Sequence, residues 1–255
     1  MKTLSLSERH NYILETLRQQ GSVSVVDLAN QLKVSSVTIR KDLTLLEEKE
    51  MLYRTHGSAI LINPYINDRH VNEKEKSYPE EKRLIGRYAA SLITADDSIL
   101  IASGTTMHAL AREIVPQGHL TVIAAAINVT NILARNKNID IIQLGGFVRN
   151  SSVSVVGNYA EKMLENFSCS KLFMGVDGID LDYGLTTTNM MEANQVMIQA
   201  AQKVVVLADS SKFGRRGFGK ICDLDAVDHI ITDKYVPSKT LEGLRERGIE
   251  VTVAE

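Results

Sequence analysis

Four short polar segments of the chain combine the residue types that bind phosphate groups and sugar hydroxyls. Ser103-Gly104-Thr105-Thr106 joins a glycine to three hydroxyl groups, and Asp209–Gly214 carries the cation Lys212. Gly145–Arg149 pairs a flexible Gly145-Gly146 turn with one arginine, and Gly175–Asp180 carries two carboxylates. Glycine permits close backbone approach, hydroxyl and backbone N–H groups donate to phosphate, and carboxylates accept hydrogen bonds from sugar hydroxyls. The segments are therefore candidates for binding a phosphorylated sugar.

Each of these segments follows a run of apolar, β-rich sequence. The predicted strands are 98–102, 120–125, 140–144, 171–176, 204–208, 229–232 and 250–253, and helices are predicted near 83–93, 106–114, 127–136, 158–166, 190–202 and 239–247. This alternation predicts a mostly parallel α/β sheet, in which ligands bind beyond the carboxyl ends of the strands. We therefore expect the four segments to share one site. The structural alternatives are a capped loop for Ser103–Thr106, turn formation for Asp177 and Asp180, and a solvated cation for Lys212.

A different chemistry is indicated near the amino terminus, in the segment that begins at Ser35. Ser35 is a typical N-cap residue, and the apolar residues that follow it recur with the spacing of one helical face. These apolar positions are Ile39, Leu43 and Leu46, whereas Val37, Arg40, Lys41 and Thr44 point to the opposite side. Short hydroxyls beside two cations are suited to base edges and phosphates of DNA. The alternative is a solvated amphipathic helix.

The neighbouring sequence favours DNA binding. Ser5-Leu6-Ser7-Glu8 has the spacing of a capping box and begins a first helix that Gly21 ends. Ser24–Asp27 begins a second helix, and Lys33-Val34 is the short turn before the third. Met51–Leu61 reads as two short strands around His56-Gly57, a wing that carries Arg54. A helix, a short turn and a helix allow the second helix to enter a major groove.

Residues 5–61 resemble the winged helix-turn-helix of the DeoR family. The residues that carry this resemblance are Arg9, Ile13, Leu17, Gly21, Val25, Leu28-Ala29, Val34-Ser35, Thr38–Leu43, Leu46-Glu47, Arg54 and His56-Gly57. Residues from about 75 to 255 resemble the DeoR sensor domain, which is related in fold to ribose-5-phosphate isomerase. Its motifs here are Asp97–Thr106, Leu144–Gly157, Phe173–Ala193 and Ala208–Gly214. Lys171–Asp180 and Ser238–Gly248 are most similar to the amino-sugar and hexitol branches of the family.

This resemblance implies a transcriptional regulator, by the family's default a repressor of a sugar, amino-sugar or polyol catabolic operon, whose operator affinity depends on a phosphorylated sugar or polyol. With the helix and wing described above, the candidate DNA-binding residues are Lys33, Ser35, Ser36, Val37, Thr38, Arg40, Lys41, Thr44, Arg54 and His56. By resemblance, phosphate is expected at Ser103–Thr106 and Lys212, and the sugar at Asp177, Gly178 and Glu192. Gly145, Gly146 and Arg149 complete the candidate effector site.

The chain departs from the family pattern in both parts. Around the wing it has Glu50 and Gly57-Ser58 where the family usually has glycines, so the turn geometry is expected to differ. In the sensor it has Ala102 where an aspartate is common and Ala124–Ala126 where Thr-Asn-Ser is common. Two polar contacts to the sugar are therefore expected to be missing, which predicts an unusual or weakly bound effector.

Charge indicates that the DNA-binding part does not act as a monomer. Residues 1–60 carry 8 Lys+Arg and 7 Asp+Glu, a net charge of +1, in a chain of net charge −2. A head this close to neutral cannot bind DNA tightly through counterion release alone. We therefore expect a homo-oligomer, a dimer or a tetramer, that places two heads on one operator.

Composition and breakers set the expected boundaries. With 44% hydrophobic residues, the 255-residue chain can form more than one core, and no apolar run approaches the ~18–20 residues of a membrane span. We expect a DNA-binding domain at 1–61, a polar linker at 62–81 and a sensor domain at 82–255. Without a signal peptide, and with Cys169 and Cys222 matching no zinc or disulfide spacing, a cytoplasmic protein with buried free thiols, no metal and no cofactor is expected.

Two alternatives remain open. The first is a sugar-phosphate isomerase with an attached DNA-binding head, for which Glu192 and Lys212 are the obvious acid–base candidates. The second is an activator of the same architecture, because the position of the operator decides between activation and repression.

Overall fold

The chain forms two compact units, Met1–Asn67 and Asp68–Glu255. The computed structural model describes residues 5–20, 22–48, 51–55, 58–61, 71–188 and 194–255. Each unit has its own hydrophobic core, and each is described by itself.

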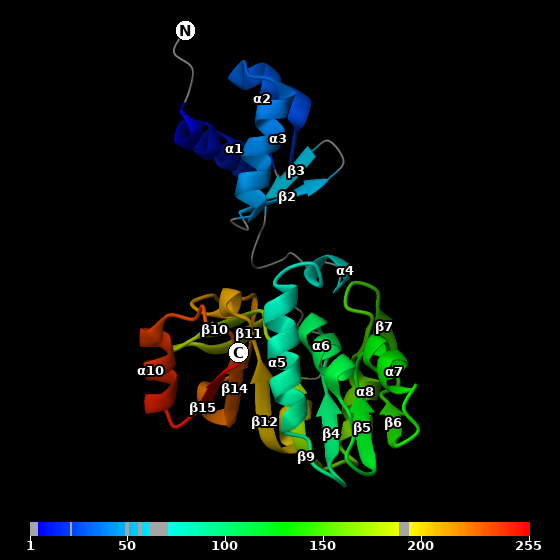
Figure 1. Cartoon of the computed structure of the whole chain (residues 1–255). Helices are drawn as coiled ribbons and strands as arrows, with labels where there is room; N and C mark the ends of the chain where they lie inside the picture. The colour runs from blue at the N-terminus through cyan, green and yellow to red at the C-terminus, as the bar shows by residue number, and fades with distance from the viewer. Residues whose placement is uncertain (1–4, 21, 49–50, 56–57, 62–70, 189–193) are drawn as a thin grey trace. The chain divides into compact units, whose positions relative to one another are not determined.

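The first unit packs three helices against a small antiparallel sheet (Figure 1). Its elements are α1 (Leu6–Gln20), β1 (Ser22–Ser24), α2 (Val25–Leu32), α3 (Ser36–Glu48), β2 (Leu52–Thr55) and β3 (Ser58–Leu61). The sheet has the order β1-β3-β2, so β2 and β3 form the hairpin that the sequence predicts. Strand β1 was not predicted, because three residues around the single buried Val23 are too few to show an alternating pattern.

Capping side chains fix where two of these helices begin. The Ser5 N–H donates to Glu8 Oε2 at 2.7 Å, and the Glu8 N–H donates to Ser5 Oγ at 3.3 Å, which is the predicted capping box. Ser24 Oγ accepts from the Asp27 N–H at 3.0 Å and caps α2. The end of α1 at Gly21 lies outside the described residues.

The second unit is built on a seven-stranded parallel sheet of order β15-β14-β12-β9-β4-β5-β6. Its strands are β4 (Ser98–Ile101), β5 (Leu120–Ala124), β6 (Ile139–Gln143), β9 (Cys169–Met174), β12 (Ala201–Leu207), β14 (His229–Thr232) and β15 (Glu250–Val253). These are the seven strands that the sequence predicts. Together with the first unit, they confirm the predicted fold class, a winged helix-turn-helix followed by a mostly parallel α/β domain.

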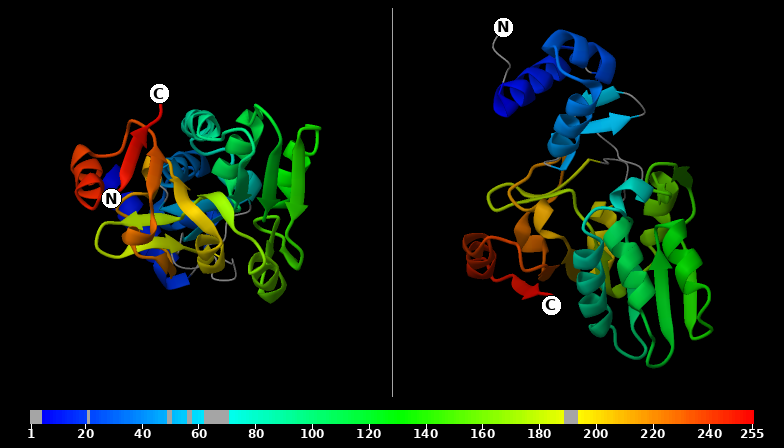
Figure 2. Two further views of the ribbon diagram at one scale, coloured as in Figure 1. Left: turned by 90° about the horizontal axis from the view of Figure 1, so that it is seen from below. Right: turned by 45° about the horizontal axis from the view of Figure 1, so that its top comes forward.

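Helices cover both faces of this sheet (Figures 1 and 2). One face packs against α5 (Pro79–Ser91), α6 (Thr105–Glu113) and α7 (Ile127–Leu133), and the other against α8 (Asn158–Leu164), α9 (Asn194–Gln199) and α10 (Ser238–Glu246). Neighbouring strand residues alternate between the two cores: Leu100 belongs to one, Ile99 and Ile101 to the other. Burial on both faces explains why central strands such as β4 and β5 are almost continuously apolar.

Helices α5 and α6 approach each other closely at Gly86. A Cβ atom at this position would lie 2.7 Å from Ala109 C and Leu110 N, so no larger side chain fits without movement. Helix α5 begins at Pro79, earlier than the expected helix near 83–93, because proline suits the first helical position. The segment expected as a linker thus contains the start of α5 and also α4 (Val71–Lys74), whose Val71 is buried.

The remaining strands are short additions to the main sheet. They are β7 (Phe147–Arg149) and β8 (Ser154–Val156), which form a hairpin, and β10 (Gly178–Asp180), β11 (Gly184–Thr187) and β13 (Gly219–Cys222), which form an antiparallel sheet. Two 3₁₀ turns are η1 (Ser210–Lys212) and η2 (Leu224–Ala226). Both cysteines are free: Cys169 is buried as expected, whereas Cys222 is only half-buried. Among the described residues, no helix is long and apolar enough to cross a membrane.

Candidate functional site

The start of α3 is set by its short connection to α2. Lys33 adopts a left-handed conformation with φ of 51°, which ends α2 and turns the chain. Ser35 Oγ then accepts a hydrogen bond from the Thr38 N–H at 3.1 Å, so Ser35 caps α3 as the sequence predicts. The two helices therefore form a helix-turn-helix.

One face of α3 is buried and the other is exposed. Ile39, Leu43 and Leu46 are at most 1% exposed, and burying each contributes about 1.5–3 kcal/mol, which fixes the orientation of the helix. On the opposite side Arg40 and Lys41 are exposed. The helix thus presents two cations to solvent.

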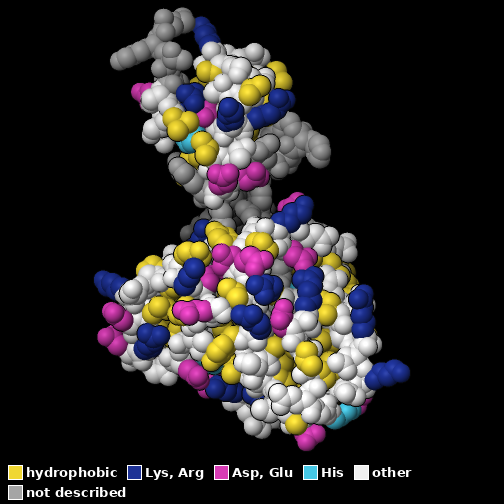
Figure 3. All heavy atoms as spheres, viewed as in Figure 1, with side chains coloured by type: hydrophobic (Ala, Val, Ile, Leu, Met, Phe, Trp, Pro, Cys, Tyr) yellow, Lys and Arg dark blue, Asp and Glu magenta, His cyan; other side chains and the backbone are white. Residues whose placement is uncertain are grey.

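The smaller polar residues of α3 are less exposed than its cations. Ser36, Thr38 and Thr44 are half-buried, while Val37 between them is 58% exposed. Thr44 Oγ1 donates to the backbone oxygen of Arg40 at 2.8 Å, so its hydroxyl hydrogen is used within the helix. On the face of this unit drawn in Figure 3, Lys and Arg side chains gather over its upper part.

A buried ion pair holds α3 against α1. Asp42 on α3 is 2% exposed and accepts from Arg9 Nε at 2.8 Å and from Arg9 Nη2 at 3.0 Å. The hydrogen bond to Asp42 is the main reason that the pKa of Arg9 is raised. These two residues position the exposed face of α3, a role that their place in the sequence motif did not reveal. In the wing, Arg54 lies in β2, opposite Ala59 of β3, whereas the Arg54 side chain and all of His56 lie outside the described parts.

In the second unit, three of the four candidate segments lie side by side. They follow β4, β9 and β12, which are neighbours in the parallel sheet, so their carboxyl ends meet at one edge. Gly145 and Gly146 follow β6, two strands away from β4. The predicted convergence is therefore strongest for the segments at Ser103, Asp177 and Lys212.

The segment after β4 has the geometry of an anion cradle. Gly104 has φ of +117°, a region that favours glycine, and a Cβ atom there would have nothing within 4 Å. Thr105 and Thr106 begin α6 and are buried, while Ser103 is half-buried. The first N–H groups of a helix have no partner within that helix, so this open turn can bind an anion.

Three lysines from different elements gather near this edge. Lys212 comes from η1, Lys74 from α4 and Lys82 from α5. Lys82 is buried, and its Nζ donates to the backbone oxygens of Lys74 at 2.7 Å and Ser77 at 2.6 Å. Burial lowers the pKa of Lys82 to about 8, an effect that Asp209 opposes and that Lys212 and Lys74 reinforce. Such a buried cation is costly unless an anion compensates it.

The sequence analysis missed Lys82 and Lys74. Lys82 lies in the charged run 80–83, which resembles a solvated helix face. A signal was nevertheless present, because Lys82 has the spacing of the buried stripe formed by Ile85, Gly86 and Ala89. Nothing in the local sequence distinguishes Lys74 from a surface lysine.

Asp177 is ionised and bound by protein groups. Its Oδ1 lies 3.1 Å from Lys74 Nζ, and its Oδ2 accepts from Thr188 N–H at 2.9 Å and Thr188 Oγ1 at 2.7 Å. Burial alone would raise the pKa of Asp177, but Lys74, Lys212 and the Thr188 hydrogen bonds together hold it well below its usual value. A sugar hydroxyl would have to share or replace these partners.

Asp180 fits the turn-forming alternative. Its Oδ1 accepts from the N–H groups of Asp182 at 3.0 Å and Tyr183 at 2.9 Å, and Arg216 binds both of its carboxylate oxygens. Packing also explains the glycine at position 178, because a Cβ atom there would lie 2.5 Å from Arg215 O. The role of Gly178 in sugar binding stays a prediction.

Two buried polar atoms at this edge have no hydrogen-bond partner among the described residues. Asp209 is 1% exposed; its Oδ1 accepts from the N–H and hydroxyl groups of Ser211, whereas its Oδ2 is unpaired. His108 on α6 is 2% exposed and its Nε2 is unpaired, and burial lowers its pKa. Buried polar atoms are rarely left unpaired, so both are suited to contact a ligand.

The positions of the remaining candidate residues give less information about the effector site. Arg149 is half-buried in β7, and Glu192 lies outside the described residues. Ala102 and Ala124–Ala126 are at most 3% exposed and pack into the two cores. Where the family pattern has polar side chains, this chain therefore has buried methyl groups.

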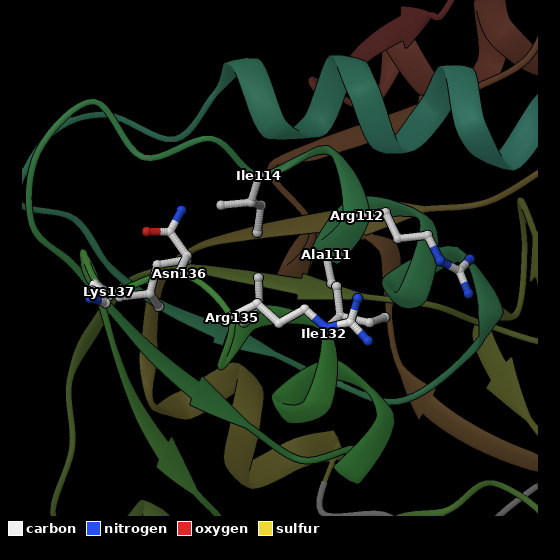
Figure 4. A pocket seen from close by; sticks show the side chains of 9 residues that line it. Ala111, Arg112, Ile114, Ile132, Arg135, Asn136 and Lys137 are labelled. Atoms are coloured by element: carbon white, nitrogen blue, oxygen red, sulfur yellow. The ribbon is translucent and has the colours of Figure 1, made fainter.

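A separate hollow of about 370 Å³ lies at the carboxyl ends of α6 and α7 (Figure 4). Cationic side chains of Arg112, Arg135 and Lys137 surround apolar side chains that include Ile114 and Leu133. None of the predicted effector residues lines it, so it is distinct from the edge described above.

Comparison with known proteins gives matches over both units. Residues 9–65 match the family described as "DeoR-like helix-turn-helix domain", and residues 77–234 match "DeoR C terminal sensor domain". The putative aga operon transcriptional repressor of Escherichia coli O157:H7 is 39% identical, covering 96% of this chain and 93% of the relative. The glycerol-3-phosphate regulon repressor of Escherichia coli K12 is 30% identical, covering 96% and 98%. Among solved structures, ribose 5 phosphate isomerase A from Neisseria gonorrhoeae aligns over 53% of each chain, with 16% identity and a TM-score of 0.38.

Proposed function

The chain belongs to the DeoR family of DNA-binding transcriptional regulators, and we propose that it represses a sugar-catabolic operon until a phosphorylated sugar or polyol lowers its operator affinity. The observation that carries this proposal is the match over nearly the whole length of relatives named as a putative aga operon repressor and as a glycerol-3-phosphate regulon repressor. It includes both the head and the sensor, so the two activities are expected to be coupled.

For DNA, the proposed interface is the exposed face of α3 with the wing. Arg40 is expected to contact a base edge and Lys41 a phosphate, since both are exposed beside the capped start of the helix. The near-neutral charge of residues 1–60 supports a homo-oligomer that places two heads on one operator. Half-site spacing in a footprint of the bound DNA tests this arrangement.

For the effector, we propose a site at the edge formed by the segments after β4, β9 and β12. Phosphate is assigned to Ser103–Thr106 and Lys212, and the sugar to the region of Asp177. The buried Lys82 supports an anionic ligand, because a phosphate would compensate a cation whose pKa burial has lowered. The buried Ala102 and Ala124–Ala126 support an effector that makes fewer polar contacts than is common in the family.

The substitution Lys212→Ala tests this assignment, with Lys234→Ala as a matched control. Lys234 is an exposed lysine in the segment after β14, which carries none of the predicted effector residues. Lys212→Ala should keep operator affinity and lose release by the phosphorylated effector, whereas Lys234→Ala should behave as the wild type. Loss of operator binding in folded Lys212→Ala would assign this lysine to assembly and contradict the effector role.

We infer that the protein acts as a regulator rather than as an isomerase, in the cytoplasm where its DNA target lies. Relatives that match over 93% and 96% of their length are named as a transcriptional repressor and a transcriptional regulator. An isomerase would need a general base near the carbon acid, for which Glu192 was the candidate. Isomerase turnover that disappears in Glu192→Gln would favour the enzyme instead.

A further inference from the structure

The segment 71–77, here called the strap, is the first described part of the second unit along the chain. Val71 anchors it, because its side chain is 2% exposed and its N–H donates to Ser151 O at 2.6 Å. Near its other end Glu75 pairs with Arg112 of α6 at 2.6 Å. The strap is therefore held at both ends by groups of the sensor.

Between these anchors the strap contacts the charged residues of the proposed effector site. Lys82 donates to the backbone oxygens of Lys74 and Ser77, and Lys74 forms an ion pair of 3.1 Å with Asp177. The side chains of this pair are 30% and 24% exposed, so the pair is accessible to a competing ion. Within the described residues, Lys212 Nζ has no hydrogen-bond or ion-pair partner.

A phosphate entering this cluster changes the balance of charges around Lys74. A phosphate monoester carries nearly two negative charges at neutral pH, against one for Asp177. It would be attracted to the same ammonium groups that now hold Asp177 ionised, namely Lys74 and Lys212. Binding of the anion is thus in competition with the contact between Lys74 and Asp177.

We propose that the strap transmits effector binding to the head, and that the ion pair between Lys74 and Asp177 is the contact released when the anion binds. This inference rests on the proposed function, because it requires a phosphorylated effector that weakens operator binding. In this proposal the ion pair, which the structure contains, belongs to the state that binds the operator. The strap is the first described part of the sensor unit after the head in the chain, so its release loosens the part of the sensor into which the chain passes from the head. The coupling free energy is then set by the difference in effector affinity between the strap with the Lys74–Asp177 ion pair intact and the strap with this pair released.

Three variants test the role of the Lys74–Asp177 ion pair without any effector. Lys74→Met removes the charge and keeps the stem, Lys74→Arg keeps the charge, and Lys76→Met is the matched control. Lys76 is an exposed lysine two residues away on the same strap, with no ion-pair partner within the described residues. Operator affinity is measured by fluorescence anisotropy, and thermal unfolding confirms that each variant is folded.

Lys74→Met should mimic the effector and weaken operator binding roughly five-fold or more, the low end of typical coupling between sites. Lys74→Arg should weaken operator binding less than Lys74→Met, because it keeps the charge, and Lys76→Met should match the wild type. Suppose that the wild type binds its operator and is released by a phosphorylated sugar, but Lys74→Met binds the operator as tightly as Lys76→Met. The proposed role of the Lys74–Asp177 ion pair is then refuted, and the proposed function stands. A wild type that binds no upstream DNA would refute the proposed function itself.

Hydrogen exchange provides a second test that needs no identified effector and no variant. With inorganic phosphate as the probe, the amides of Glu75, Lys76 and Ser77, which are hydrogen-bonded within the strap, should exchange faster in the wild-type protein. Amides of the buried strand β9 serve as the internal reference. Unchanged or slower exchange of the strap at phosphate concentrations that saturate binding would overturn the proposal.

Discussion

Lys82 should give the sensor an unusual dependence of stability on pH. The pKa of this lysine falls from 10.5 to about 8 in the folded protein, mainly because the ammonium group is buried. This difference corresponds to about 3 kcal/mol of free energy. At neutral pH the folded state carries that full cost, because the lysine is protonated in both the folded and the unfolded state.

The cost should disappear as pH rises from about 8 toward 10.5. In this range the unfolded chain keeps its proton on Lys82 while the folded protein loses it, so the free energy of unfolding increases with pH. Substitution Lys82→Met removes the titrating group. It also leaves the oxygens of Lys74 and Ser77 without their donor, which adds an offset that does not vary with pH.

Denaturant unfolding of the wild type and Lys82→Met, followed at several pH values, measures this effect. Between neutral pH and about pH 10 the wild type should gain roughly 2–3 kcal/mol relative to the variant. The affinity for phosphate should change in the opposite direction, because a neutral amine no longer attracts an anion. The wild-type affinity should fall above pH 8, and that of Lys82→Met should not. Identical pH dependence of unfolding in both proteins would mean that Lys82 does not have a lowered pKa in the folded protein.

The remaining predictions concern the head and the two cores. Arg40→Ala should remove specific operator binding at a cost of about 1–3 kcal/mol, whereas Lys41→Ala should weaken all DNA sequences alike and reduce the salt slope by about one; unchanged operator affinity in Arg40→Ala would mean that a different helix reads the groove. For Asp97, burial opposes ionisation, but the 2.7 Å contact with Lys171 and other hydrogen bonds lower the pKa to about 2. The stabilisation of about 2 kcal/mol should be present above pH 3.8 and lost as pH falls toward 2, and Asp97→Asn should lack this acid dependence in denaturant unfolding. Gly86→Ala should cost about 1–3 kcal/mol in the same assay, and wild-type stability would contradict the close approach of α5 to α6.

The main sheet could be predicted from the sequence because its central strands are largely buried and apolar. Runs such as Ser98–Ile101 and Leu120–Ala124 are almost continuously apolar, and helical segments separate the strands. The short strands β1, β7 and β10 were missed, since three residues with mixed polarity show no periodicity. Their pairing depends on partners elsewhere in the fold.

The candidate site was predictable only in part, and for a similar reason. The segments after β4, β9 and β12 could be placed together, because parallel strands end at one edge. Lys74 could not, because it meets Asp177 across 103 residues of chain. Lys82 was hidden among charged neighbours although its helical phase matches the buried stripe. A contact between distant charged residues depends on the tertiary fold, which local spacing does not encode.

The central claim is that a phosphorylated sugar or polyol releases this protein from its operator. The most direct measurement is fluorescence anisotropy of the wild-type protein on its own upstream DNA, with a panel of hexose, amino-sugar and polyol phosphates and their unphosphorylated forms. We expect salt-dependent binding that one phosphorylated ligand abolishes and its unphosphorylated form does not. Tight binding that is indifferent to every phosphorylated ligand in the panel would contradict this claim.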